Sequence, residues 1–228
     1  MLETQSRQNA FFAIFLLVFA SSFAVTIALF LAPGIIGQIA FLLCKIALLA
    51  LPISWFFWID GDRLKISPPR WNEVFVGIGL GLLMFAAICG AYWLFGDGID
   101  PGVARERAQQ AGITNPTRYW IGAAYFCFVN ALVEEYIWRW FVYRKCEILL
   151  PGIRAVWLSA LLFTLHHILA LSAYTAWPIV ILGSLGVFLA GAIWSWCYLT
   201  YRSIVSGYVS HILADLAIAI VGWQILFA

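Results

Sequence analysis

Long runs of apolar residues recur along the chain, separated by short clusters of glycine, proline and charged residues. Most runs reach the roughly 20 residues that a helix needs to cross the hydrocarbon core of a bilayer. The runs are continuous rather than alternating, which excludes a transmembrane β-barrel. The pattern therefore predicts an all-α, polytopic transmembrane helical bundle of about seven spans, at 10–32, 35–59, 73–95, 119–143, 155–176, 178–200 and 204–227.

The composition agrees with a membrane protein. Of the 228 residues, 64% are hydrophobic and 11% are charged, whereas about 25% of residues are charged in soluble domains. No low-complexity linker divides the chain, so we expect one integral membrane domain, in which 1–118 holds the first three spans and a loop and 119–228 holds the last four. We expect that loop, 96–118, to be a solvated connector, with a short interfacial helix as the alternative.

The composition and the net charge also predict the partners of the protein. The lipid bilayer is one of them, and the net charge of +2 without a basic cluster argues against nucleic acid. The sequence does not set the oligomeric state.

The loop charges predict the orientation in the membrane. The side that holds the N-terminus carries eight lysines and arginines, against three on the other side, all of them in the loop 96–118. The positive-inside rule therefore places the N-terminus in the cytoplasm, and seven spans place the C-terminus outside. We expect a multi-pass protein of the bacterial inner (plasma) membrane. The eight residues are Arg7, Arg63, Lys65, Arg70, Arg144, Lys145, Arg154 and Arg202.

A small set of polar residues lies well inside the expected spans. At ~1.5 Å per helical residue, Glu134 of the fourth span, His167 of the fifth, and His211 and Asp215 of the seventh lie roughly 14–20 Å from the N-terminal side. Ionisable groups at such depth are costly and are usually functional. The agreement in depth across three helices therefore predicts one site, drawn from Asn130, Glu134, Glu135, Arg139, His166, His167, His211 and Asp215, which include all three histidines of the chain.

Helical spacing predicts different roles for the two adjacent glutamates. Residues four apart share a helix face, so Glu135 can form an ion pair with Arg139, and His211 and Asp215 point the same way. Glu134 lies about 100° away around the axis and can face the histidines with a free carboxylate. We therefore expect Glu135 to be structural and Glu134 to be chemical.

Other polar residues have structural interpretations that compete with functional ones. We expect Lys45, alone in the second span, to snorkel or to pair locally. We expect His166 to be a packed histidine rather than a second ligand beside His167. Asn130 fits an interhelical hydrogen bond as well as a role in the site.

Three short motifs carry a family resemblance. "EEYIWR" (Glu134, Glu135, Arg139) fits EExxxR, "FTLHH" (Phe163, His167) fits FxxxH, and "HILAD" (His211, Asp215) fits HxxxN/D. In their order and separation they resemble the CPBP intramembrane proteases, the group that contains type II CAAX prenyl endopeptidases and bacteriocin-processing or immunity proteins. The resemblance covers roughly 119–220, and the first 118 residues contribute no motif.

The resemblance implies a glutamate-dependent intramembrane endopeptidase that cuts a membrane-proximal or lipid-linked peptide. It implies that Glu134 and His167 activate a water and that His211 and residue 215 stabilise the oxyanion, with Glu135, Arg139, Phe163, His166 and Asn130 in support. General base catalysis of this kind contributes ~10²–10⁴-fold and oxyanion donors ~10²–10³-fold.

The sequence departs from the family pattern in two places. Asp215 stands where the family often has Asn, and an ionised Asp cannot donate a hydrogen bond to an oxyanion. Asp215 would then orient His211, remain protonated or bind a metal. The family's first motif often reads EExxFRG, whereas Trp138 and Trp140 flank Arg139 here, and the loss of the small residue would reshape the substrate entrance.

Other functions remain open at this point. No cofactor is required by the sequence, but Glu134, His167, His211 and Asp215 are a ligand set that suits Zn²⁺ in type. The motifs HExxH, GxGD and GxSG are absent, which argues against those membrane protease classes. A non-enzymatic peptide-binding or immunity scaffold and a proton-coupled transporter with an acid–histidine relay are the alternatives.

Overall fold

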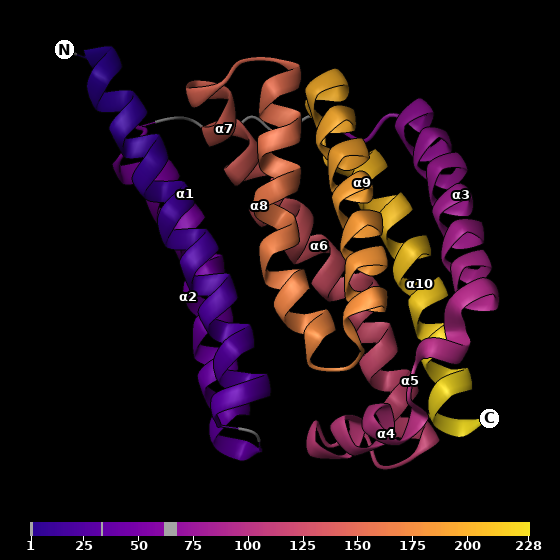
Figure 1. Ribbon diagram of the computed structural model, residues 1–228. Helices are drawn as coiled ribbons and strands as arrows, with labels where there is room; N and C mark the ends of the chain where they lie inside the picture. Colours follow the sequence, from indigo (N-terminus) through magenta and orange to yellow (C-terminus); the bar gives the residue numbers. More distant parts are fainter. Residues whose placement is uncertain (1, 33, 62–67) are drawn as a thin grey trace.

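The computed structural model describes residues 2–32, 34–61 and 68–228, and every regular element within these ranges is helical. The long helices run side by side along one common direction (Figure 1). They are α1 (Leu2–Thr26, continued by a π-helical turn, η1, Ile27–Leu31), α2 (Ile35–Trp58), α3 (Trp71–Phe95), α8 (Ile153–Ser172), α9 (Trp177–Tyr201) and α10 (Val205–Phe227). Each of the six is long and apolar enough to cross a membrane, which confirms the all-α polytopic fold.

The expected fourth span forms a continuous helical run that differs from the other six. It comprises α5 (Pro116–Ala124), the π-helical segment η3 (Tyr125–Asn130), α6 (Ala131–Glu134), the π-helical segment η4 (Glu135–Tyr143) and α7 (Arg144–Leu149). Segments with π-helical bonding are frequent at functional sites. Here η3 ends four residues before Glu134 and η4 begins at Glu135, on the run that holds the largest share of the intramembrane polar residues.

The N-terminus and C-terminus lie at opposite ends of the bundle (Figure 1), as an odd number of crossings requires. At the N-terminal end Lys145 pairs with Asp60, and Arg202 lies 2.9 Å from Glu147 across the α7 and α9 ends. Arg63 and Lys65 lie outside the described residues. The cytoplasmic placement of this end stays a prediction.

The loop 96–118 contains a helix, so the expectation of a plain connector is wrong. Helix α4 (Pro101–Gln110) lies across the C-terminal end of the bundle (Figure 1). Asp100 caps its first turn by accepting from the backbone N–H of Gly102, and Pro101 occupies the first helical position, where its missing N–H is not needed. Arg105 donates to the carbonyl of Leu226, which attaches α4 to α10.

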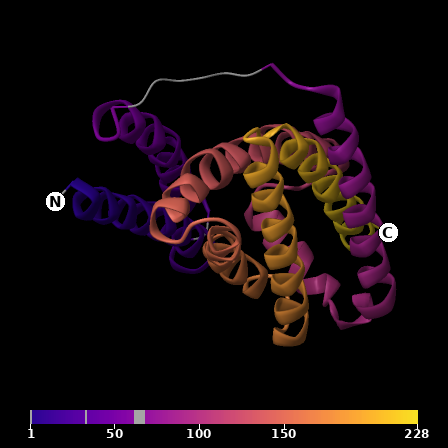
Figure 2. The same ribbon diagram turned by 90° about the horizontal axis from the view of Figure 1, so that it is seen from above.

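Helices α3 and α10 pack closely on the side of the bundle away from α1 and α2 (Figure 2). Gly77 and Gly81 lie four apart on α3 and face α10, where an added Cβ would lie 2.8 Å from Val209 Cβ or 2.6 Å from Leu213 Cδ1. Small residues at this spacing allow helices to approach closely in a membrane, where van der Waals contact drives association. Helix α10 also contacts η3 and α6, which places His211 beside the glutamate run.

Candidate functional site

The polar residues of three helices meet in the interior of the bundle. Glu134 is 8% exposed, Glu135 0%, His211 4% and Asp215 3%. The first two lie on the α6–η4 run, and the last two lie on α10, about 80 residues further along the chain. His167 projects from α8 toward the same region and is partly buried. The structure thus brings together the residues that were grouped by depth in the sequence.

Glu135 is held by charged groups on two helices. Its Oε1 lies 3.3 Å from Nη1 of Arg139, the expected ion pair, and 3.1 Å from Nδ1 of His211. Gly207, one turn before His211 on α10, leaves room for this carboxylate, because an added Cβ would overlap its Oε2. The expected ion pair of Glu135 with Arg139 is therefore present, and Glu135 also contacts a histidine of the site, which was not expected.

Arg139 is fully buried and lies between two aromatic faces. Its guanidinium carbon is 4.4 Å from the ring centre of Phe163 and 4.9 Å from that of Trp194. Such contacts attract a cation toward the ring and strengthen when water is excluded. The Phe163 of the second motif thus supports the arginine of the first motif, and Gly191 of α9 makes room for it, since a Cβ there would lie 3.1 Å from Phe163 Cδ1.

Glu134 is oriented by a chain of hydrogen bonds that begins in the N-terminal half of the protein. Lys45 of α2 donates to Oδ1 of Asn130 at 2.7 Å, and Asn130 Nδ2 donates to Glu134 Oε1 at 2.9 Å. Asn130 therefore makes an interhelical hydrogen bond and also positions the glutamate, so both interpretations of this residue apply. Oε2 of Glu134 remains directed toward His211, with Nε2 at 3.7 Å.

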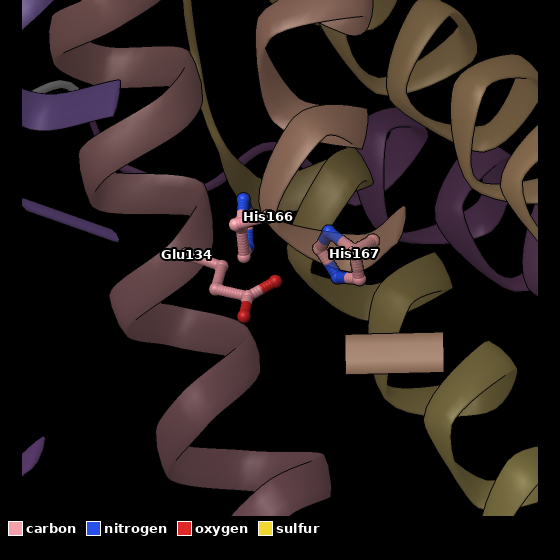
Figure 3. A group of neighbouring side chains, drawn as sticks. All are labelled: Glu134, His166 and His167. Atoms are coloured by element: carbon pink, nitrogen blue, oxygen red, sulfur yellow. The ribbon is translucent and has the colours of Figure 1, made fainter. Parts of the chain in front are cut away.

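The two adjacent histidines of α8 both face Glu134 (Figure 3). Their rings are 4.1 Å apart, and one donor atom from each and one carboxylate oxygen of Glu134 all lie within 4.8 Å of one another. His167 Nδ1 lies 3.0 Å from the carbonyl oxygen of Phe163. A carbonyl only accepts, so this nitrogen carries the proton and Nε2 of neutral His167 has a free lone pair.

His166 combines packing with a place beside Glu134. Its ring stacks on Trp138, with centres 5.1 Å apart and planes at 4°, which agrees with the expected packed histidine. It also belongs to the group of donor atoms around Glu134. The donors that lie closest together therefore include His166 beside Glu134 and His167, which differs from the four-residue zinc set considered from the sequence.

His211 lies between several partners on α10, η4 and α9. Its ring stacks on Trp194, with centres 4.0 Å apart and planes at 17°. The indole N–H of Trp194 in turn donates to Ser210 Oγ at 2.8 Å. Asp215 Oδ1 lies 3.7 Å from His211 Nε2, and its Oδ2 has no hydrogen-bond partner among the described residues.

Sequence reasoning missed Trp194 and Gly207 and assigned Lys45 only a local role. Gly207 precedes His211 by four, so helical spacing could have identified it as a small residue on the face of the site. No local signal distinguishes Trp194 among twelve tryptophans. The partner of Lys45, Asn130, becomes evident only from the packing of α2 against the glutamate run.

A cavity of about 590 Å³ lies toward the N-terminal end of the molecule, and none of its lining residues belongs to this cluster. Residues of α1, η4 and α7 and the C-terminal end of α2 line it, and Trp140 is among them. The tryptophan that replaces a small residue of the family motif therefore borders an opening on the side of the glutamate run. Glu134, His167 and His211 are not part of its lining.

Comparison with known proteins gives one match. A family model described as "Type II CAAX prenyl endopeptidase Rce1-like" matches residues 116–217. The segment spans the glutamate run, α8, α9 and the half of α10 that carries His211 and Asp215. Neither the curated proteins nor the solved structures contain a match.

Proposed function

We propose that this chain, whose residues 116–217 belong to the Type II CAAX prenyl endopeptidase Rce1-like family, cleaves a membrane-associated or lipid-linked peptide near its terminus. The family is one of intramembrane CAAX-type endopeptidases. The observation that carries the proposal is the meeting of Glu134, His167 and His211 from three helices in a buried cluster. Buried ionisable groups inside a membrane protein are costly and are therefore retained mainly for function.

The attacking water would lie between Glu134 and His167. Asn130 holds Oε1 of the glutamate, which leaves Oε2 as a proton acceptor. The bond from His167 Nδ1 to the Phe163 carbonyl leaves Nε2 as a second acceptor. Two acceptor atoms within 4.8 Å of one another can be bridged by a single water that donates to both, because two hydrogen bonds of about 2.8 Å span up to roughly 5.6 Å.

His211 would stabilise the negative charge that develops on the substrate carbonyl oxygen by donating a hydrogen bond to it. Its Nδ1 faces Glu135 at 3.1 Å, and its Nε2 faces Glu134 and Asp215, each at 3.7 Å. A ring with carboxylates at both nitrogens matches the doubly protonated form, which donates from Nδ1 to Glu135 and from Nε2 into the site. Asp215 then acts through His211 as a positioning residue, so the Asp found here does not need to donate to the oxyanion.

The bond changes are those of amide hydrolysis. Water oxygen forms a bond to the scissile carbonyl carbon while its proton passes to Glu134. The tetrahedral intermediate collapses, the C–N bond breaks, and Glu134 returns the proton to the leaving amine. General base catalysis by such a pair contributes ~10²–10⁴-fold and an oxyanion donor ~10²–10³-fold.

Comparative proteomics of intact cells tests the proposal. Cells that express the wild-type protein should contain a new peptide terminus that is absent with Glu134→Gln. Glu106→Gln serves as the matched control, because Glu106 is an exposed glutamate on α4 that bonds only to Gln110 among the described residues. Identical termini in wild-type and Glu134→Gln cells, with both proteins in the membrane, would favour the peptide-binding scaffold over an enzyme.

A further inference from the structure

We propose that Glu134, His166 and His167 form a binding site for a transition-metal ion of the Zn²⁺ type, and that an ion bound there switches the peptidase off. The first half of this proposal, metal binding, is argued from the geometry of the three residues alone. The inhibitory half rests on the proposed function, because it requires Glu134 and His167 to be the groups that hold the water.

The arrangement of the donor atoms supports the site. One nitrogen of each histidine and one carboxylate oxygen all lie within 4.8 Å of one another. The two imidazoles come from consecutive positions of α8 and the carboxylate from α6, and they face a common space (Figure 3). Zinc binds nitrogen and oxygen ligands at about 2.0–2.2 Å, so a small inward movement of these side chains would surround one ion.

His166 supplies the independent observation that a ligand belongs here. Its side chain is only 9% exposed, and its Nδ1 has no hydrogen-bond partner among the described residues. A buried polar atom without a partner is uncommon and needs an explanation such as an ion. The proposed peptidase chemistry does not use His166, and stacking on Trp138 fixes the plane of its ring, as a ligand that must keep one orientation requires.

The surroundings of the other two ligands fit a metal site as well. Metal-bound histidines usually donate their second ring N–H to a carbonyl or carboxylate, and His167 Nδ1 makes such a bond to Phe163. Ligating carboxylates are themselves hydrogen-bonded, as Glu134 is by Asn130. Both ligands are thus held by neighbours that leave a lone pair directed to the common space.

The chemistry of the donors selects the kind of ion. Two imidazoles and one carboxylate suit Zn²⁺, Co²⁺, Ni²⁺ or Cu²⁺, whereas Mg²⁺ and Ca²⁺ prefer oxygen alone. Three protein ligands leave a fourth tetrahedral position for water. The ion would lose most of its hydration shell on entering this buried site. Its bonds to the three ligands must therefore be strong enough to offset the cost of dehydration.

Occupancy of this site would block the proposed reaction. The lone pair of His167 and the carboxylate of Glu134 cannot bind the ion and accept a proton from water at the same time. Of the other two acids in the cluster, Glu135 is held by Arg139 and His211, and Asp215 faces His211. Neither is among the donors that surround the space, so no acid is placed to replace Glu134 as the base.

Cobalt spectroscopy on the full-length protein in detergent tests the binding half without reference to activity. The wild type should bind one Co²⁺ per chain, with the visible absorption of a four-coordinate ion, and Zn²⁺ should displace it. His166→Phe, which keeps a ring to stack on Trp138, should weaken binding at least tenfold, and His166→Gln, which keeps a polar side chain, should do the same. Glu106→Gln, at an exposed position on α4, is the control and should change the affinity less than threefold.

Three results would overturn the site. The first is the absence of stoichiometric Co²⁺ binding to the folded wild type. The second is equal affinity in the wild type and both His166 variants. The third is near-ultraviolet thiolate absorption, which would assign the ion to cysteines instead.

The proposed inhibition is tested by measuring the peptidase activity of each protein with and without bound Zn²⁺. Peptidase activity of the wild type should be full in a chelator and should fall at least tenfold when Zn²⁺ saturates the site. The zinc concentration for half inhibition should rise at least tenfold in His166→Phe. Activity that disappears in chelator and returns with Zn²⁺ would contradict inhibition. If no variant shows peptidase activity, the proposed function and the inhibitory half fail together, while the cobalt measurements still decide whether the site exists.

Discussion

The Nδ1 atom of His211 lies 3.1 Å from Oε1 of Glu135, while the Nε2 atom of the same ring lies 3.7 Å from Oε2 of Glu134. One imidazole from α10 is therefore placed between two glutamates that are adjacent in the sequence. The two carboxylates differ in their other partners, Arg139 for one and Asn130 for the other. This difference predicts that removing each negative charge has a different consequence.

Glu134→Gln should remove activity without unfolding the protein. The amide keeps the size of the side chain and can still accept from Asn130, but it cannot take a proton from water. We expect kcat to fall by at least ~10²-fold and the thermal midpoint to stay within a few degrees of the wild type. The measurement is turnover of a reconstituted substrate beside a thermal melt of the same sample, with Glu106→Gln as the control. Wild-type turnover in Glu134→Gln would remove the glutamate from the mechanism.

Glu135→Gln should instead destabilise the fold. It leaves Arg139, which is 1% exposed, without its carboxylate, and breaking a buried pair by removing one partner costs about 3–5 kcal/mol. Unfolding in denaturing detergent measures the loss. The double variant Glu135→Gln/Arg139→Met removes both charges and should recover part of the stability. A single variant as stable as the wild type would show that the ion pair is not needed.

Gly207→Ala should displace the Glu135 carboxylate from between Arg139 and His211. An added methyl group would overlap Oε2 of Glu135, and the carboxylate carries two contacts that must keep their geometry. We expect both activity and stability to fall, with activity reduced at least tenfold. Gly186→Ala is the matched control, since this glycine lies in helix α9 and an added Cβ there meets nothing within 4 Å. Equal behaviour of the two variants would contradict the close contact.

Asn130→Ala should lower activity because it frees Oε1 of Glu134 and removes the partner of Lys45. A hydrogen bond of this kind contributes about 1–2 kcal/mol, which corresponds to a fall in kcat of roughly fivefold to thirtyfold. Lys45→Met, which removes the first member of the chain but leaves the amide on Glu134, should cost less. Ser54→Ala on the same helix α2 is the control, because its hydroxyl bonds only to the Ala50 carbonyl among the described residues. Lys45→Met with a larger effect than Asn130→Ala would reverse the assigned order.

Trp194 should act on activity through the orientation of His211. Trp194→Phe keeps a ring that can stack on the imidazole and face Arg139, but it loses the donation to Ser210. We therefore expect a fall in kcat of less than about tenfold, below the effect of Trp194→Leu. Stacking of aromatic rings contributes about 0.5–1.5 kcal/mol beyond the area that it buries. Trp196→Leu, at an exposed position on the same helix, should leave kcat unchanged. A Trp194→Leu protein with wild-type turnover would contradict the positioning role.

Local sequence determined the helices and the positions of the site residues along them. A helix in lipid satisfies its backbone hydrogen bonds within the segment, so apolar runs predict spans without knowledge of their neighbours. Each of the seven expected spans is largely helical in the structure, and six of these helices are long and apolar enough to cross a membrane. Spacing within one helix likewise predicted the ion pair of Glu135 with Arg139, because four residues make one turn. Counting residues from the charged ends of the spans predicted that Glu134, His167 and His211 lie at a similar depth, because those ends lie at the same side of the bundle.

Only the tertiary structure decided which faces meet. The bond from Lys45 to Asn130 joins residues 85 positions apart, and the contact of His211 with Glu135 joins residues 76 apart. Which way each helix is rotated depends on close contacts such as Gly77 and Gly81 of α3 against α10, whose energy comes from surfaces that fit together rather than from any single residue. The sequence by itself therefore determined which residues share a depth in the membrane, and helix packing decided that one glutamate stabilises Arg139 and His211 while the other faces two histidines.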